Sequence, residues 1–172
     1  MVSLGLDAST TCVGYAFTKD KKILDMGFID IKKEKTPKDK VQKVLEFINN
    51  NSYIDEVYNI NIEDNLSGFA GGRTSQQVII KLAKFNAILC FMLENFDFKV
   101  HNINPMTARK NVFGKARVKG KKAKQFVQEE IEKMYNTNKW CKKTTRGNWD
   151  NGRAVEHCWP TGRDGRLRQH LP

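Results

Sequence analysis

The sequence predicts an α/β fold with a mixed central β-sheet flanked by helices, and two patterns lead to that prediction. Residues 2–7, 13–17 and 23–31 are β-type segments separated by short polar turns, which is typical of an antiparallel meander. After residue 36, segments with helical and with strand periodicity alternate. A chain of 172 residues is long enough to bury a core. We therefore expect one domain over residues 1–159 and an irregular, basic tail over residues 160–172.

The first expected helix follows the meander. Thr36 is a suitable N-cap, and Pro37 suits the first helical position. Four apolar residues repeat at helical spacing and form one stripe: Val41, Val44, Leu45 and Ile48.

The segment around residues 57–63 alternates as a half-buried strand does. We expect Tyr58, Ile60 and Ile62 on one face, and Asn59, Asn61 and Glu63 on the other. A long helix over residues 75–96 is apolar nearly all the way round. We therefore expect one face of this helix to pack against the core of the same chain and another face to pack against a partner subunit. The expected order of elements ends with a strand over 98–104 and helices over 105–114, 121–135 and 150–159. In the helix over 121–135, the expected inner face includes Ala123, Phe126 and Met134.

The charge of the chain is distributed unevenly. Its net charge is +11. The first 100 residues hold 13 Lys and Arg and 13 Asp and Glu, whereas the last 72 hold 17 and 6. A basic field confined to one part of a chain favours a polyanionic partner, most often nucleic acid, and on charge alone a solvated basic surface is the alternative.

The remaining bulk features point to a cytoplasmic protein. No unbroken apolar run is long enough for a membrane span, and the start lacks the basic and apolar regions of a signal peptide. The four cysteines are scattered, without metal-finger spacing, and we expect reduced thiols.

Two acidic residues end expected core strands, Asp7 and Glu63. If those strands are neighbours, the two carboxylates meet at one edge of the sheet, where they repel unless a cation neutralises them. Oxygen ligands without nearby His or Cys suit Mg²⁺ or Mn²⁺. A third acid, Asp150, begins the last expected helix.

Residues 108–124 form a basic stretch with eight Lys and Arg in seventeen residues, interrupted by Gly114 and Gly120. A solvated face would explain such a run, and so would a loop that binds phosphates. Carboxylates beside a basic surface are what two-metal phosphodiester hydrolysis requires, since the acids hold the metals and the cations position the backbone.

Three motifs resemble those of the RuvC-like Holliday junction resolvases, which have the ribonuclease H-like fold. "LGLDASTTCVGYAF" is similar to the first strand-turn-strand of the family, with Asp7 as first metal ligand. "INIEDNLSGFAGGRTSQQVIIKLAKFNAIL" is similar to the second motif, with Glu63 as the catalytic glutamate and the long helix in the dimer-forming region. "INPMTARKNVFGKARVKGKKAKQFVQE" is similar to the proline-led, lysine-rich DNA-binding segment.

The resemblance implies a Mg²⁺-dependent endonuclease, with Mn²⁺ as a possible substitute, that cuts branched DNA in recombination and repair. It implies a homodimer, with Asp7, Glu63 and Asp150 as metal ligands and catalytic residues, and a phage-type member is one form of the family that the resemblance suggests. We expect DNA contacts from Phe69, Arg73, Arg109, Lys110, Lys115, Arg117, Lys119, Lys121, Lys122 and Lys124.

The fourth motif departs from the family pattern. Family members end with two acids three residues apart; here Asp150 matches the first, and Arg153 stands at the second. A guanidinium cannot ligate a cation, so a catalytically impaired protein that binds branched DNA is the alternative function. The first motif also resembles the phosphate loop of actin-like ATPases, but the chain is too short for their two lobes. Flaps and forks are alternative substrates.

Overall fold

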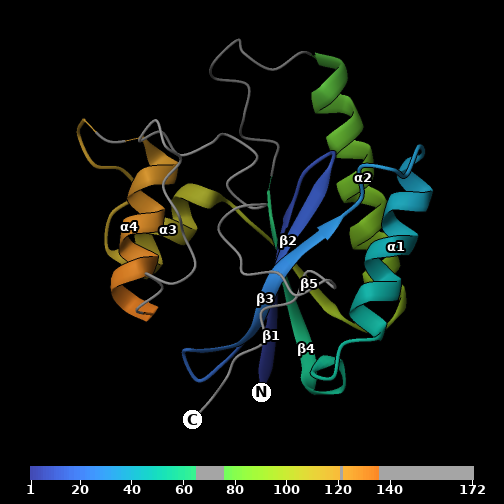
Figure 1. Cartoon of the computed structure of the whole chain (residues 1–172), viewed down its shortest axis with the longest axis horizontal. Helices are drawn as coiled ribbons and strands as arrows, with labels where there is room; N and C mark the ends of the chain where they lie inside the picture. The colour runs from blue at the N-terminus through green and yellow to red at the C-terminus, as the bar shows by residue number, and fades with distance from the viewer. Residues whose placement is uncertain (65–75, 121, 136–172) are drawn as a thin grey trace. The chain divides into compact units, whose positions relative to one another are not determined.

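The computed structural model describes residues 1–64, 76–120 and 122–135 (Figure 1). These residues belong to two compact units, of which the first runs from Met1 to Asn104 and the second begins at Pro105. The first unit holds five strands, β1 (Val2–Ala8), β2 (Cys12–Lys19), β3 (Lys22–Asp30), β4 (Val57–Glu63) and β5 (Lys99–Ile103). It also holds α1 (Pro37–Asn49), the 3₁₀ helix η1 (Ile54–Glu56) and α2 (Gln76–Asn95).

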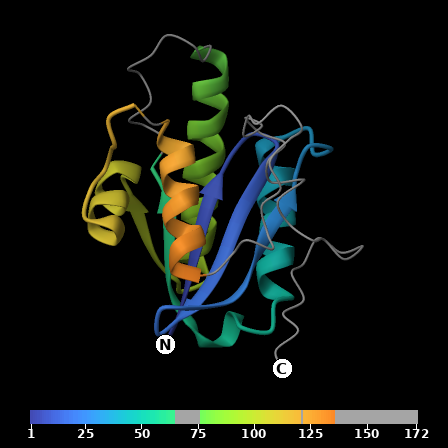
Figure 2. The same ribbon diagram turned by 60° about the vertical axis from the view of Figure 1, so that its left-hand side comes forward.

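The five strands form one mixed sheet in the order β3-β2-β1-β4-β5. The pairs β1–β2 and β2–β3 are antiparallel, as the expected meander requires, whereas β1–β4 and β4–β5 are parallel. Four strands therefore run in one direction and β2 runs against them. The twist of the strands is plain in Figure 2. The carboxyl ends of β1, β3, β4 and β5 consequently lie at the same edge of the sheet, which we call the carboxyl edge.

One face of the sheet carries the core of the first unit. Alternate residues of the strands are buried on this face, including Leu4, Phe17 and Ile60. Both α1 and α2 pack against it, on one side of the sheet (Figure 1). The opposite face, which we call the polar face, holds small and polar residues at the intervening positions of β1, β2 and β4.

Helix α1 forms as expected, with its N-terminus fixed by a capping box. The Asp39 backbone N–H donates to the Thr36 hydroxyl at 3.1 Å, and the Thr36 N–H donates back to the Asp39 carboxylate at 3.3 Å. The buried residues of α1 are the expected stripe, namely Val41, Val44, Leu45 and Ile48.

Strand β4 differs from its expected alternation at one residue. Val57 pairs with Val2 and Asn59 with Ser3, so Tyr58 is an extra residue at a bulge and is 54% exposed. Val57 is buried in its place. A β-bulge resets the alternation of side chains, so the expectation that Tyr58 shares the buried face is wrong, while Ile60 and Ile62 are buried as expected.

Helix α2 buries one stripe and exposes another. Phe85, Leu89 and Leu93 are buried in the core, whereas Ile80 and Phe91 are 52% and 62% exposed. In the described part of the chain, α2 is the one helix long and apolar enough to cross a membrane by length and composition. By length and composition alone, the expectation of no spanning segment is not borne out for α2. Its buried stripe packs in the core of the first unit, and 17% of the apolar window is buried.

The described part of the second unit consists of α3 (Pro105–Phe113) and α4 (Ala123–Tyr135). Helix α3 ends before Gly114, whose φ of 73° is the left-handed conformation that commonly terminates helices. Phe113 packs edge-on against Phe126, which is buried, with ring centroids 5.5 Å apart. Ala123 and Met134 are exposed, so only part of the expected inner face of α4 is buried.

Candidate functional site

Asp7 and Glu63 lie side by side at the carboxyl edge. In the parallel register of β1 and β4, Leu6 is opposite Ile62, and the two acids are the next residues on their strands. Because Leu6 and Ile62 both point into the core and side chains alternate, Asp7 and Glu63 both belong to the polar face. Neighbouring strands are about 4.8 Å apart, so the structure brings together the two acids that the sequence singled out.

The two carboxylates are accessible from solvent, and the β2 residue beside Asp7 has no side chain. Asp7 is exposed and Glu63 is partly buried. Gly14 of β2 is the partner of Asp7, and a Cβ atom at Gly14 would lie 3.7 Å from the Asp7 Cβ. Glycine therefore leaves space beside Asp7 that any other residue would occupy.

A third acid, Asp64, follows β4 at the same edge and is not among the site residues expected from the sequence. Its backbone N–H donates to the Ile103 carbonyl at 2.9 Å, which extends the β4–β5 pairing past Glu63. Asp7, Glu63 and Asp64 each take part in polar or electrostatic interactions within the structure. Among the described residues, no group of three His, Cys, Asp or Glu side chains is placed to hold a metal ion. The closeness of these three acids along the chain and across one strand pair therefore does not by itself make a metal site.

The turn after Asp7 is fixed by the hydroxyl of Ser9. This hydroxyl donates to the Cys12 carbonyl at 2.8 Å and accepts from the Cys12 N–H at 3.1 Å. The hydroxyl thus stabilises the β1–β2 turn, in keeping with a structural role for Ser9. Cys12 and Cys90 are free thiols, and burial raises the pKa of Cys90.

Polar side chains continue along the polar face away from the carboxyl edge. Asn61 is opposite His101 in the β4–β5 register, and the His101 Nε2 is 3.1 Å from the Asn59 Oδ1. This contact gives His101 a structural role on the sheet, beside Asn61 and two positions before Glu63.

The basic stretch lies at the surface of the second unit. Lys110, Lys115, Arg117, Lys119 and Lys122 are exposed, and Arg109 is partly buried. The Lys115 Nζ lies 5.9 Å from the centre of the Phe126 ring, a weak cation–π contact that leaves the ammonium group accessible.

Several expected site residues fall outside the described part of the chain. They are Phe69, Arg73, Lys121, Asp150 and Arg153, with the tail over residues 160–172; for Lys124 the backbone is described and the side chain is not. Their expected roles, and the expected extent of the domain, stay predictions.

The mixed sheet with order β3-β2-β1-β4-β5 and its flanking helices have the architecture of the ribonuclease H-like class of α/β folds. Among solved structures of this class, the chain is similar to that of RuvC from Thermus thermophilus, with a TM-score of 0.56 and 12% identity over 92% of this chain and 91% of that chain. It is also similar to T. thermophilus RuvC in complex with Holliday junction substrate, with a TM-score of 0.52 and 12% identity over 67% of this chain and 73% of that chain.

At this level of identity the likeness establishes the fold, and the expected fold class is confirmed. No protein-family model matches the sequence. No curated protein matches it either.

Proposed function

We propose that this protein is a metal-dependent endonuclease that cleaves branched DNA, with the Holliday junction as its substrate. The observation that carries the proposal is the placement of Asp7 and Glu63 on one face and at one edge of adjacent parallel strands. The RuvC fold supports it, since a solved RuvC structure of this fold holds a Holliday junction substrate.

The residues at the carboxyl edge fit a hard divalent cation. Asp7 and Glu63 offer charged oxygen donors, and such donors suit Mg²⁺ or Mn²⁺. We propose Asp150 as the third ligand. When bound, the metal supplies Lewis-acid stabilisation of the phosphodiester and activation of the attacking water. Asp7 and Glu63 hold the cation, and the exposure of Asp7 leaves room for the scissile phosphate.

The basic stretch holds the DNA in this proposal. Lys115, Arg117 and Lys119 of this stretch are exposed, and none of them takes part in an ion pair among the described residues. Phosphate contacts of this kind position DNA and make its binding fall steeply with salt.

We further propose that the protein acts as a homodimer through α2. Ile80, Ile88 and Phe91 form an exposed apolar stripe opposite the residues that α2 buries in the core. A two-fold dimer presents two identical sites, which a four-way junction with two symmetric nicks requires.

The test is cleavage of a four-way junction with each strand labelled in turn, with and without Mg²⁺. We expect the wild type to nick two opposing strands in Mg²⁺, and Asp7→Asn to bind the junction without cutting it. Asp55→Asn is the matched control, because Asp55 is an exposed acid of η1, at the opposite edge of the sheet. Cutting by Asp7→Asn, or equal cutting of linear duplex by the wild type, would contradict the proposal.

The alternative function, binding without cutting, is favoured by Arg153 at the position of an expected acid. Junction binding by the wild type with no nicks in Mg²⁺ or Mn²⁺ would establish that alternative.

A further inference from the structure

The connection between β3 and α1 is the most lysine-rich segment of the first unit. Residues 30–43 hold six lysines and three acids. Lys32, Lys33, Lys35 and Lys38 are exposed, and we call these four the β3–α1 lysine cluster. The first 100 residues are neutral as a whole, so the charge balance of the sequence does not single out these lysines.

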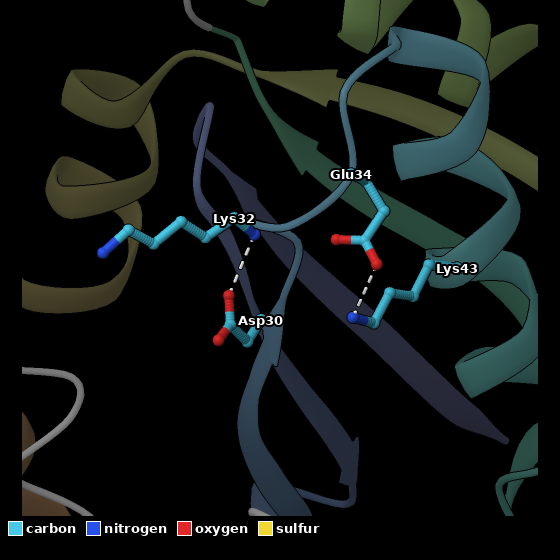
Figure 3. Close-up of polar contacts among 4 residues, drawn as sticks. All are labelled: Asp30, Lys32, Glu34 and Lys43. Carbon is cyan, nitrogen blue, oxygen red and sulfur yellow. Dashed lines mark hydrogen bonds and ion pairs between the residues drawn. The ribbon is translucent and has the colours of Figure 1, made fainter.

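The three acids of this segment are each engaged locally. The Asp30 carboxylate accepts from the Lys32 backbone N–H at 2.9 Å, and the Glu34 carboxylate pairs with the Lys43 Nζ at 2.8 Å (Figure 3). The hydrogen bond from Lys43 holds the pKa of Glu34 below its usual range, so the Glu34 carboxylate is ionised at neutral pH. Asp39 is part of the α1 capping box.

The positive charge of the cluster is consequently left facing solvent. Figure 3 shows the Lys32 side chain extending away from both Asp30 and the Glu34–Lys43 pair. Among the described residues, no ion pair involves Lys32, Lys33, Lys35 or Lys38. A surface lysine without an acidic partner can bind a phosphate at no cost in broken ion pairs.

Hydrogen bonds fasten this segment to the turn that follows Asp7. The Ile31 N–H donates to the Thr11 carbonyl at 2.9 Å, and the Lys40 Nζ donates to the Thr10 carbonyl. Since β3 runs in the same direction as β1, it also ends at the carboxyl edge. The cluster is therefore held at the same edge as Asp7 and Glu63, within the same unit.

We infer that the β3–α1 lysine cluster binds the phosphate backbone of the DNA substrate next to the scissile phosphate, an inference that rests on the proposed function. Across β2, the β3 residue level with Asp7 is Phe28, two strand spacings or about 10 Å away, and Lys32 follows four residues later. The cluster therefore begins about 10 to 16 Å from Asp7, which at 3.4 Å of helix axis per nucleotide corresponds to about three to five nucleotides. The cluster is a second basic surface, separate in the sequence from residues 108–124.

The first experiment compares two triple variants of equal charge. Lys32→Gln, Lys33→Gln and Lys35→Gln together remove three members of the cluster. Lys21→Gln, Lys22→Gln and Lys99→Gln together remove three exposed lysines from the β2–β3 turn and the start of β5, at the opposite edge. Binding of a four-way junction is measured without divalent metal as a function of salt, and thermal unfolding shows that both variants are folded.

The expected loss follows from counterion release. Each phosphate contact contributes about 0.9 to the slope of log K against log salt, which is about eight-fold in affinity at 0.1 M salt. We expect the cluster variant to bind on the order of 100-fold more weakly, with a slope lower by about 2 to 3. The control should bind within about three-fold of the wild type, because distant charges are screened at this ionic strength.

A second experiment locates the contact. Junctions with a single neutral methylphosphonate, placed in turn along one strand, are bound by the wild type and by the cluster variant. We expect the neutral linkage to weaken wild-type binding at positions about three to five nucleotides from the cut. It should have no further effect on the cluster variant there, since lysine and phosphate form one interaction.

The outcomes separate this inference from the proposed function. An unchanged slope for the cluster variant, or an equal loss in the control, overturns the inference while leaving the nuclease proposal intact. Wild-type binding without cutting overturns the nuclease proposal, and the slopes still decide the role of the cluster. A wild type that binds no junction overturns both.

Discussion

The neighbouring positions of Asp7 and Glu63 lead to a prediction about folding stability that requires no DNA. The two residues occupy matching positions on adjacent parallel strands and share one face. At about 5 Å, two like charges repel by about 0.8 kcal/mol in bulk water and about 3 kcal/mol at an effective dielectric constant of 20. Because Asp7 is exposed, we take a value of about 1 kcal/mol, near the solvent limit.

Replacing one acid by its amide removes that repulsion. In EDTA, we expect Asp7→Asn to unfold at a temperature about 2 to 4 °C above that of the wild type, the shift that about 1 kcal/mol produces in a protein of this size. Glu63→Gln should give a similar increase. The double variant should add little to either single variant, because the same repulsion is removed only once.

In Mg²⁺, we expect the wild type to unfold at a higher temperature than Asp7→Asn, the reverse of the order in EDTA. A ligand that binds only the folded state raises its unfolding temperature, so Mg²⁺ should stabilise the wild type. At an effective dielectric constant of 20, a carboxylate about 4 Å from a single positive charge gains about 4 kcal/mol, and it gains more from a divalent cation. Loss of the carboxylate should therefore lower the affinity by about 10³-fold or more. Asp7→Asn should therefore show no stabilisation at millimolar Mg²⁺.

Thermal unfolding followed by circular dichroism, in EDTA and in Mg²⁺, tests both parts of this prediction. Asp55→Asn at the opposite edge is the control and should respond to Mg²⁺ as the wild type does. The reasoning is refuted if Mg²⁺ stabilises Asp7→Asn as much as the wild type, or if Asp7→Asn lowers the unfolding temperature in EDTA.

Two further predictions concern the subunit interface and the end of the chain. Ile80→Lys with Phe91→Lys should convert the proposed dimer to a monomer in analytical ultracentrifugation. The monomer should still fold, because both side chains are more than half exposed in the single chain. An unchanged mass would show that α2 is not the interface. Arg153→Asp should raise Mg²⁺-dependent cutting if the arginine stands in place of a metal ligand, and equal or lower cutting would show that Arg153 has a role of its own.

Local signals explain which parts of the fold could be predicted from the sequence. The meander of β1 to β3 follows from short polar turns, and the start of α1 follows from Thr36 and Pro37. Tyr58 was placed on the wrong face because a bulge depends on the pairing of β4 with β1, more than 50 residues away. The 3₁₀ helix η1 was not expected, because a single turn carries no periodicity.

The candidate site could be predicted from the sequence only if β1 and β4 were assumed to be neighbours. Two strand-end acids can be read from the sequence, but their meeting requires that β1 and β4 be adjacent and parallel, a long-range fact that the structure supplies. The lysine cluster was missed for a similar reason. Its lysines are plain in the sequence, whereas its attachment to the turn after Asp7 depends on Lys40 and Thr10, thirty residues apart.

The direction of the strands connects these features. A strand parallel to β1 must end where β1 ends, and β3 meets this condition because two antiparallel steps restore the direction of the chain. The segment that follows β3, with its lysines, therefore lies at the edge where Asp7 and Glu63 lie. The same argument predicts that a chain of this fold with an even number of strands in its meander would send that segment to the opposite edge. The odd number of strands in the meander is thus what allows carboxylates and lysines from distant parts of the first unit to face one substrate.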